Sequence, residues 1–67
     1  MNSTEAKIIK AFAANLVKID DPMRAAFVTC IEIRDEATAK WGEDAGVAAF
    51  HATASTIAKS VREAVSA

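Results

Sequence analysis

The apolar residues of this chain recur at spacings of three and four, which is the period of an amphipathic α-helix. The first such segment covers residues 4–19 and leaves Asn15 and three lysines on the side opposite the apolar residues. Its apolar side consists of Ile8, Ile9, Phe12, Ala13, Leu16, Val17 and Ile19. The pattern predicts a helix over residues 4–19, with Asn2 or Ser3 as its N-cap.

A second helix is predicted over residues 22–41, and it begins at the single proline of the chain. Pro22 fits the first helical position, and the Asp21 carboxylate is suited to cap the helix. The apolar side consists of Met23, Ala26, Phe27, Cys30, Ile31, Ile33, Ala37 and Trp41. Arg34 and Thr38 interrupt this side, which is otherwise expected to face a core.

A third helix is predicted over residues 45–65, after a break in the apolar pattern that lies at the two glycines, Gly42 and Gly46. Gly42 suits a left-handed C-cap and Asp44 suits the next N-cap. The apolar residues change phase at the glycines, which argues against one continuous helix from residue 22 onwards. They form a heptad seam of Val47, Phe50, Ala54, Ile57, Val61 and Ala64, which we expect to close the core. A second subunit is expected to contact the small residues on the remaining surface: Ala48, Ala49, Ala52, Thr53, Ser55, Thr56 and Ser60.

These segments predict an all-α fold, a compact three-helix bundle with short turns that forms a single domain over residues 1–67. A chain of 67 residues has room for only a small core, and one cysteine cannot form an internal disulfide. We therefore expect a homodimer that hides the remaining apolar surface of the helices.

Composition and charge narrow the class of protein. The net charge is −1 with both signs interspersed, whereas nucleic-acid-binding proteins usually carry a basic excess. The sequence shows neither a signal-peptide pattern nor an apolar run of the roughly 20 residues that a membrane helix needs. Together with the lone thiol, these features predict a cytoplasmic protein.

The chemistry-bearing side chains do not form a recognisable catalytic or metal-binding pattern. Cys30 lies in the middle of an apolar helix side and is expected to be a small buried residue. His51 is the only histidine, and nothing marks the acid or oxyanion site that a His51–Ser55 dyad would need. We expect no enzymatic activity, no metal and no cofactor.

Three residues are candidates for contact with a partner protein: Arg34, Trp41 and His51. Arg34 either pairs with a carboxylate across an interface or extends along apolar surface to water. Trp41 is either a core residue, which we favour, or a binding hot spot. His51 is either a residue at the boundary of the apolar seam or a pH-sensitive contact.

The sequence therefore favours a protein–protein interaction module, a small regulator or inhibitor that binds a larger cytoplasmic protein through a helix face. Accessory proteins of bacteria and phages often have this size, which is an analogy only. The alternative is a dimeric helical protein that binds nucleic acid through Lys7, Lys10 and Lys18. The simpler interpretation of these lysines is a solvated helix face.

Overall fold

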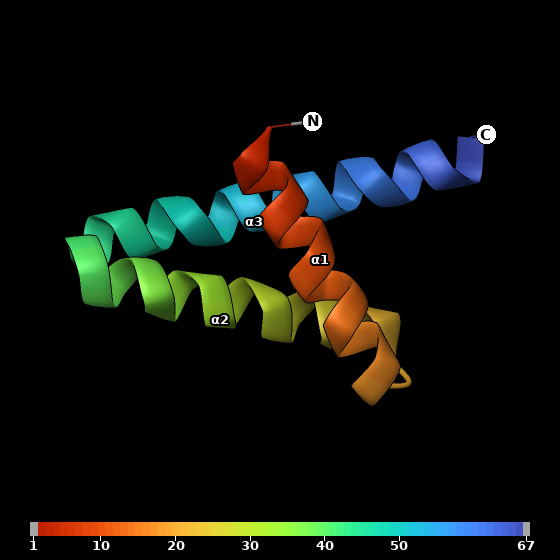
Figure 1. The fold of residues 1–67 in the computed structure, drawn as a ribbon, viewed down its shortest axis with the longest axis horizontal. Helices are drawn as coiled ribbons and strands as arrows, with labels where there is room; N and C mark the ends of the chain where they lie inside the picture. The colour runs from red at the N-terminus through yellow and green to blue at the C-terminus, as the bar shows by residue number, and fades with distance from the viewer. Residues whose placement is uncertain (1, 67) are drawn as a thin grey trace.

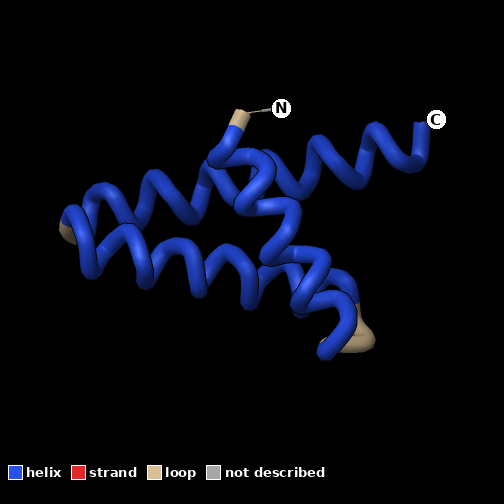
Figure 2. Tube along the Cα trace, in the orientation of Figure 1, coloured by secondary structure: helices blue, strands red, loops and turns tan. Residues whose placement is uncertain are grey.

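The computed structural model describes residues 2–66, which form three α-helices and no strand. These are α1 (Ser3–Lys18), α2 (Pro22–Trp41) and α3 (Glu43–Ser66). Helices α2 and α3 run antiparallel as a hairpin, and α1 crosses this hairpin obliquely (Figure 1). Only short loops separate the helices (Figure 2). The prediction of an all-helical three-helix bundle with short turns is confirmed.

Capping side chains define where the first two helices begin. The Asn2 side chain accepts a hydrogen bond from the Glu5 backbone N–H over 2.8 Å. One carboxylate oxygen of Asp21, Oδ1, accepts from the backbone N–H groups of Met23 at 2.9 Å and Arg24 at 3.4 Å. Both caps were predicted, because an N-cap depends on residues adjacent in sequence.

The turn between α2 and α3 is a single residue, Gly42, with φ of 100° and ψ of 176°. Its N–H donates to the carbonyl of Thr38. The positive φ expected at this glycine is confirmed, but the predicted left-handed helical conformation is wrong, because ψ lies far outside that region. The prediction of Asp44 as the next N-cap is wrong, because α3 begins at Glu43 and Asp44 lies in its first turn. Gly46 lies inside α3, as the predicted range 45–65 has it.

Gly46 allows α2 and α3 to approach closely. A Cβ atom at this position would overlap Oγ1 of Thr38 and lie 3.2 Å from the carbonyl oxygen of Arg34. Thr53, farther along α3, is also fully buried within the chain. The expectation that the small residues of this helix serve a second subunit is therefore wrong for Thr53, which the chain buries itself.

Helix α1 is attached to α2 partly through buried polar groups. Asn15 is only 6% exposed, and its Nδ2 donates to Oγ1 of Thr29 and to Oε1 of Glu32, both over 2.8 Å. The Thr29 hydroxyl donates in turn to the carbonyl of Ala25. The prediction that Asn15 faces solvent with the lysines is wrong, because its amide finds two acceptors on α2.

The core is small: one cluster takes a buried apolar residue from each helix, Ile8, Cys30 and Ile57, and Ala25 and Ala37 of α2 are also buried. Half-buried apolar residues surround it: Phe12, Ala26, Ile33 and Phe50. The predicted heptad seam of α3 is only partly buried, because Val47 and Val61 remain exposed beside Ile57. The core thus leaves a substantial part of the apolar helix surface uncovered.

Candidate partner-binding groove

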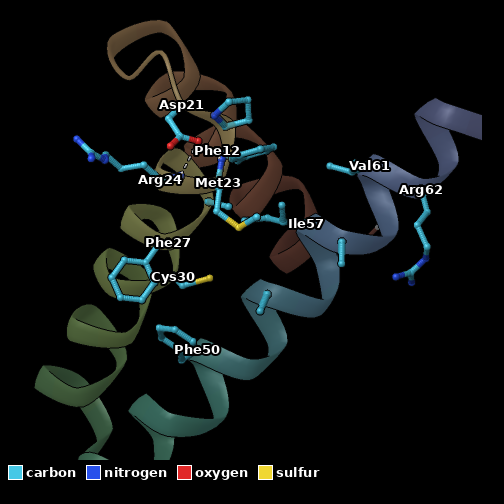
Figure 3. A pocket seen from close by; sticks show the side chains of 14 residues that line it. Phe12, Asp21, Met23, Arg24, Phe27, Cys30, Phe50, Ile57, Val61 and Arg62 are labelled. Carbon is cyan, nitrogen blue, oxygen red and sulfur yellow. Dashed lines mark hydrogen bonds between the residues drawn. The ribbon is translucent and has the colours of Figure 1, made fainter.

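An open groove of about 870 Å³ lies between the N-terminal half of α2 and residues 50–62 of α3, and Phe12 of α1 also lines it. All but three of the residues that line it are apolar. Figure 3 shows Met23 and Phe27 on α2 facing Ile57 and Val61 on α3 across this groove. The feature has the volume and apolar lining that are usual for a binding site.

The helical repeat and the shape of the hairpin together create the groove. On α2, Met23, Phe27 and Cys30 follow a spacing of four and three, so their side chains share one side of the helix. Ile57 and Val61 are one helical turn apart on α3. The two helices start together at Gly42 and separate with distance from it (Figure 1), so the facing apolar sides do not close on each other.

The groove has a buried base and an exposed apolar rim. Cys30 and Ile57 are buried, whereas Met23 is 79% exposed, Phe27 57% and Val61 47%. Phe27 and Phe50 make an edge-to-face contact with ring centroids 6.2 Å apart. The prediction that Met23 and Phe27 face the core is therefore wrong, because α1 reaches this groove with Phe12 and leaves both side chains exposed.

The polar lining of the groove is two arginines and one carboxylate. The carboxylate, Asp21, accepts hydrogen bonds from the first turn of α2. Arg24 lies on the α2 side and Arg62 on the α3 side, with guanidinium groups that extend away from the groove base (Figure 3). Within residues 2–66, neither arginine forms an ion pair. Each edge of the groove thus carries one arginine, and the Asp21 carboxylate lies on the edge that carries Arg24.

The Cys30 thiol contributes an apolar surface to this site. Burial raises the pKa of the Cys30 thiol above its usual value, and a weaker backbone hydrogen bond opposes the shift. The thiol therefore remains protonated near neutral pH, which is the opposite of the low pKa that a reactive cysteine needs. The prediction of Cys30 as a buried small residue is confirmed.

The structure does not bring together the three partner-binding residues suggested by the sequence. Arg34 lines a second pocket of about 430 Å³ and pairs with the adjacent Asp35 at 3.0 Å. Trp41 is 72% exposed with the Lys40 ammonium 5.6 Å from its ring, so its assignment to the core is wrong. His51 is exposed, and neither it nor Trp41 lines either pocket. A role for Arg34, Trp41 or His51 in binding stays a prediction.

The sequence reasoning missed the groove residues as a site, because it assigned Met23, Phe27, Phe50 and Val61 to the core. One signal did point to them. Helices of a chain this short carry more apolar surface than a single small core can bury. The periodicity shows that such a surplus exists, but only the packing of the helices shows which part of it stays exposed.

The three lysines proposed for nucleic-acid binding do not form a continuous unpaired basic surface, because one of them is in an ion pair. The Lys7 ammonium forms an ion pair with Glu36 of α2, and Glu36 also lies 3.5 Å from the ammonium of Lys40. Lys10 and Lys18 are exposed. Since the Glu36 carboxylate partly neutralises Lys7, the face is weaker than the sequence suggested, and nucleic-acid binding stays a prediction.

Residues 2–66 contain neither a cluster of metal ligands nor a membrane-spanning helix. No three histidine, cysteine or carboxylate side chains in this range converge where they would hold a metal ion. None of the three helices, within the same limits, has the length and apolar character needed to cross a bilayer. Comparison of the chain with protein families, characterised proteins and solved structures finds no match.

Proposed function

We propose that this chain is a protein–protein interaction module, a small regulator or inhibitor that receives a helix of a larger cytoplasmic protein in the α2–α3 groove. One observation carries the proposal: Met23, Phe27 and Val61 expose apolar side chains around a groove with an apolar base. Contiguous exposed apolar surface of this kind usually marks an interaction site.

The groove has the form that suits a helical ligand. An amphipathic helix binds such a groove by placing side chains at i, i+3 or i+4, and i+7 between the walls. Here α2 and α3 supply the two walls, and Phe27 and Phe50 supply the aromatic surface that is typical of strong contacts. Burying Phe27 and Met23 against a partner would remove the two largest apolar side chains of the rim from water.

A second copy of the chain is the competing occupant of the groove. A two-fold interface presents the same patch on both subunits, so it would enclose two copies of Arg24 and of Arg62 against two copies of Asp21, an excess of positive charge. Like charges in one interface disfavour that arrangement. The homodimer expected from the sequence stays a prediction. Val17 on α1 is 88% exposed and lies outside the groove, so a homodimer could use this apolar surface instead.

A display selection of helical peptides against the immobilised chain tests the proposal. We expect the enriched peptides to bind the wild type and the Val17→Ser variant equally, and to lose at least tenfold in affinity on Phe27→Ser. Both substitutions shorten an exposed apolar side chain, but only Phe27 lines the groove. Selection of no peptide, or equal binding to both variants, would contradict a binding function for this groove.

A further inference from the structure

Resting on the proposed function, we propose that the partner of this groove is an acidic amphipathic helix, with an apolar stripe that is flanked on both sides by aspartate or glutamate. The charges at the groove edges carry this inference. Arg24 lies on one edge and Arg62 on the other, so a helix lying between α2 and α3 would have a cation on each flank (Figure 3).

The chain does not neutralise these two arginines itself. Asp21 is the single carboxylate in the lining, and its Oδ1 already accepts from the backbone N–H groups of Met23 and Arg24. In the described part of the chain, no carboxylate forms an ion pair with either guanidinium. Both groups are therefore available to carboxylates of a ligand.

Arg24 and Arg62 are distinguished from the other cations by their place in the groove lining, since Lys10, Lys18 and Lys59 also form no ion pair within residues 2–66 but lie outside the groove. Arg34 pairs with Asp35, and Lys7 and Lys40 flank Glu36. An arginine fork can bind a carboxylate through two parallel hydrogen bonds, and its long side chain can turn toward a ligand. Contacts of this kind at the edge of an interface select the sign of the partner's charge and raise the association rate.

Three synthetic peptides of about four helical turns (~14 residues) test the inference. They share one apolar stripe of leucine and phenylalanine and carry glutamate, glutamine or lysine at the flanking positions. Fluorescence anisotropy measures their affinity for the wild-type chain at low and high salt. We expect the glutamate peptide to bind about tenfold more tightly than the glutamine peptide, and the lysine peptide to bind least, because each edge charge contributes a small factor.

Charge reversal assigns the effect to the two arginines. We expect the double variant Arg24→Glu/Arg62→Glu to reverse the order and prefer the lysine peptide. The matched control is Lys10→Glu, which changes an exposed cation of α1 outside the groove and leaves the order unchanged. High salt is expected to reduce the preference for the glutamate peptide, because exposed charges are screened.

The possible results separate this inference from the proposed function. Equal binding of all three peptides, with loss on Phe27→Ser, would overturn the acidic partner and leave the groove as a binding site. Binding of none would overturn both. A dimer in sedimentation equilibrium that dissociates on Phe27→Ser would make a second copy the occupant, and this too would overturn the inference.

Discussion

The Asn15 amide on α1 and the Thr29 hydroxyl on α2 are joined by a hydrogen bond of 2.8 Å that is buried between the two helices. The same amide donates to Glu32, so one side chain of α1 satisfies two acceptors of α2. If α1 shifted, the buried amide would lose its acceptors, and a buried polar group without a partner costs free energy of folding. The contact therefore fixes where α1 crosses the hairpin.

Removing the Asn15 amide should loosen the attachment of α1. We expect Asn15→Ala to lower the free energy of unfolding by about 1–3 kcal/mol, because Thr29 and Glu32 lose their donor. Urea denaturation followed by circular dichroism measures the change. Lys10→Ala, which alters an exposed residue of the same helix, should change stability by less than about 0.5 kcal/mol.

A carboxylate in place of that amide should make stability depend on pH. In Asn15→Asp the new carboxyl would face Glu32, and burial beside a like charge raises the pKa of the new group in the folded state. A carboxyl group whose pKa is raised by folding lowers the stability of the folded state at a pH above its unfolded-state pKa, and this loss disappears below that pKa. The deficit of Asn15→Asp relative to wild type should therefore be largest at neutral pH and shrink as the pH falls toward about 4. A deficit that does not vary with pH would contradict this placement of residue 15.

The contact between Gly46 and Thr38 gives a prediction with a built-in control. Alanine is favoured over glycine in a helix by about 1 kcal/mol, but the added Cβ overlaps Thr38 Oγ1. We expect Gly46→Ala to destabilise the wild type, because overpacking typically costs about 1–3 kcal/mol. In a Thr38→Ala background the same change should become less harmful or stabilising. A double-mutant cycle of unfolding free energies measures the coupling, and additive effects would contradict the close approach of α2 and α3.

The capping carboxylate of α2 is expected to contribute to stability by itself. Asp21→Ala should lower the free energy of unfolding by about 1 kcal/mol, since two backbone N–H groups of the first turn lose their acceptor. The neighbouring change Asp20→Ala removes the same charge from a residue that is not the cap. Thermal melts that show equal losses for the two variants would argue against the cap.

Glu36 links α1 to α2 and should make part of the stability sensitive to acid. Hydrogen bonding and charge attraction from Lys7, with a further attraction from Lys40, lower the pKa of Glu36 below its ordinary value of 4.5. Because the pKa of Glu36 is lower in the folded state, its ion pairs stabilise the fold fully above pH 4.5. This stabilisation is lost as the pH falls through the lowered pKa.

Glu36→Gln should therefore be less stable than the wild type at neutral pH and nearly equal to it in acid. Urea denaturation across this pH range measures the difference. Glu63→Gln is the matched control, because Glu63 forms no ion pair within residues 2–66. A difference between wild type and Glu36→Gln that persists unchanged in acid would rule out the ionic link.

The helix boundaries could be predicted from the sequence because they depend on neighbouring residues. The Asp21–Pro22 pair and the Gly42 turn act locally, and both lie where the pattern placed them. The role of Gly46 could not be predicted, because a glycine next to a turn suits either the turn or a close helix contact. Only the position of α2 decides between these uses.

The buried sides of the helices could be predicted only in part. Ile8, Cys30 and Ile57 are buried as the periodicity indicated. Asn15 is buried against the pattern, because a polar side chain can be buried once its partners are in place. Phe27 is exposed against the pattern, because α1 crosses the hairpin elsewhere, and that crossing depends on contacts between helices distant in sequence.

The most direct test of the central claim is a chemical-shift map of the isotope-labelled chain with the glutamate-flanked peptide. We predict that the largest changes fall on the groove residues Met23, Phe27, Phe50 and Val61, with little change at Val17 and Trp41. Changes concentrated at Val17 or Trp41, with the groove residues unaffected, would contradict the account.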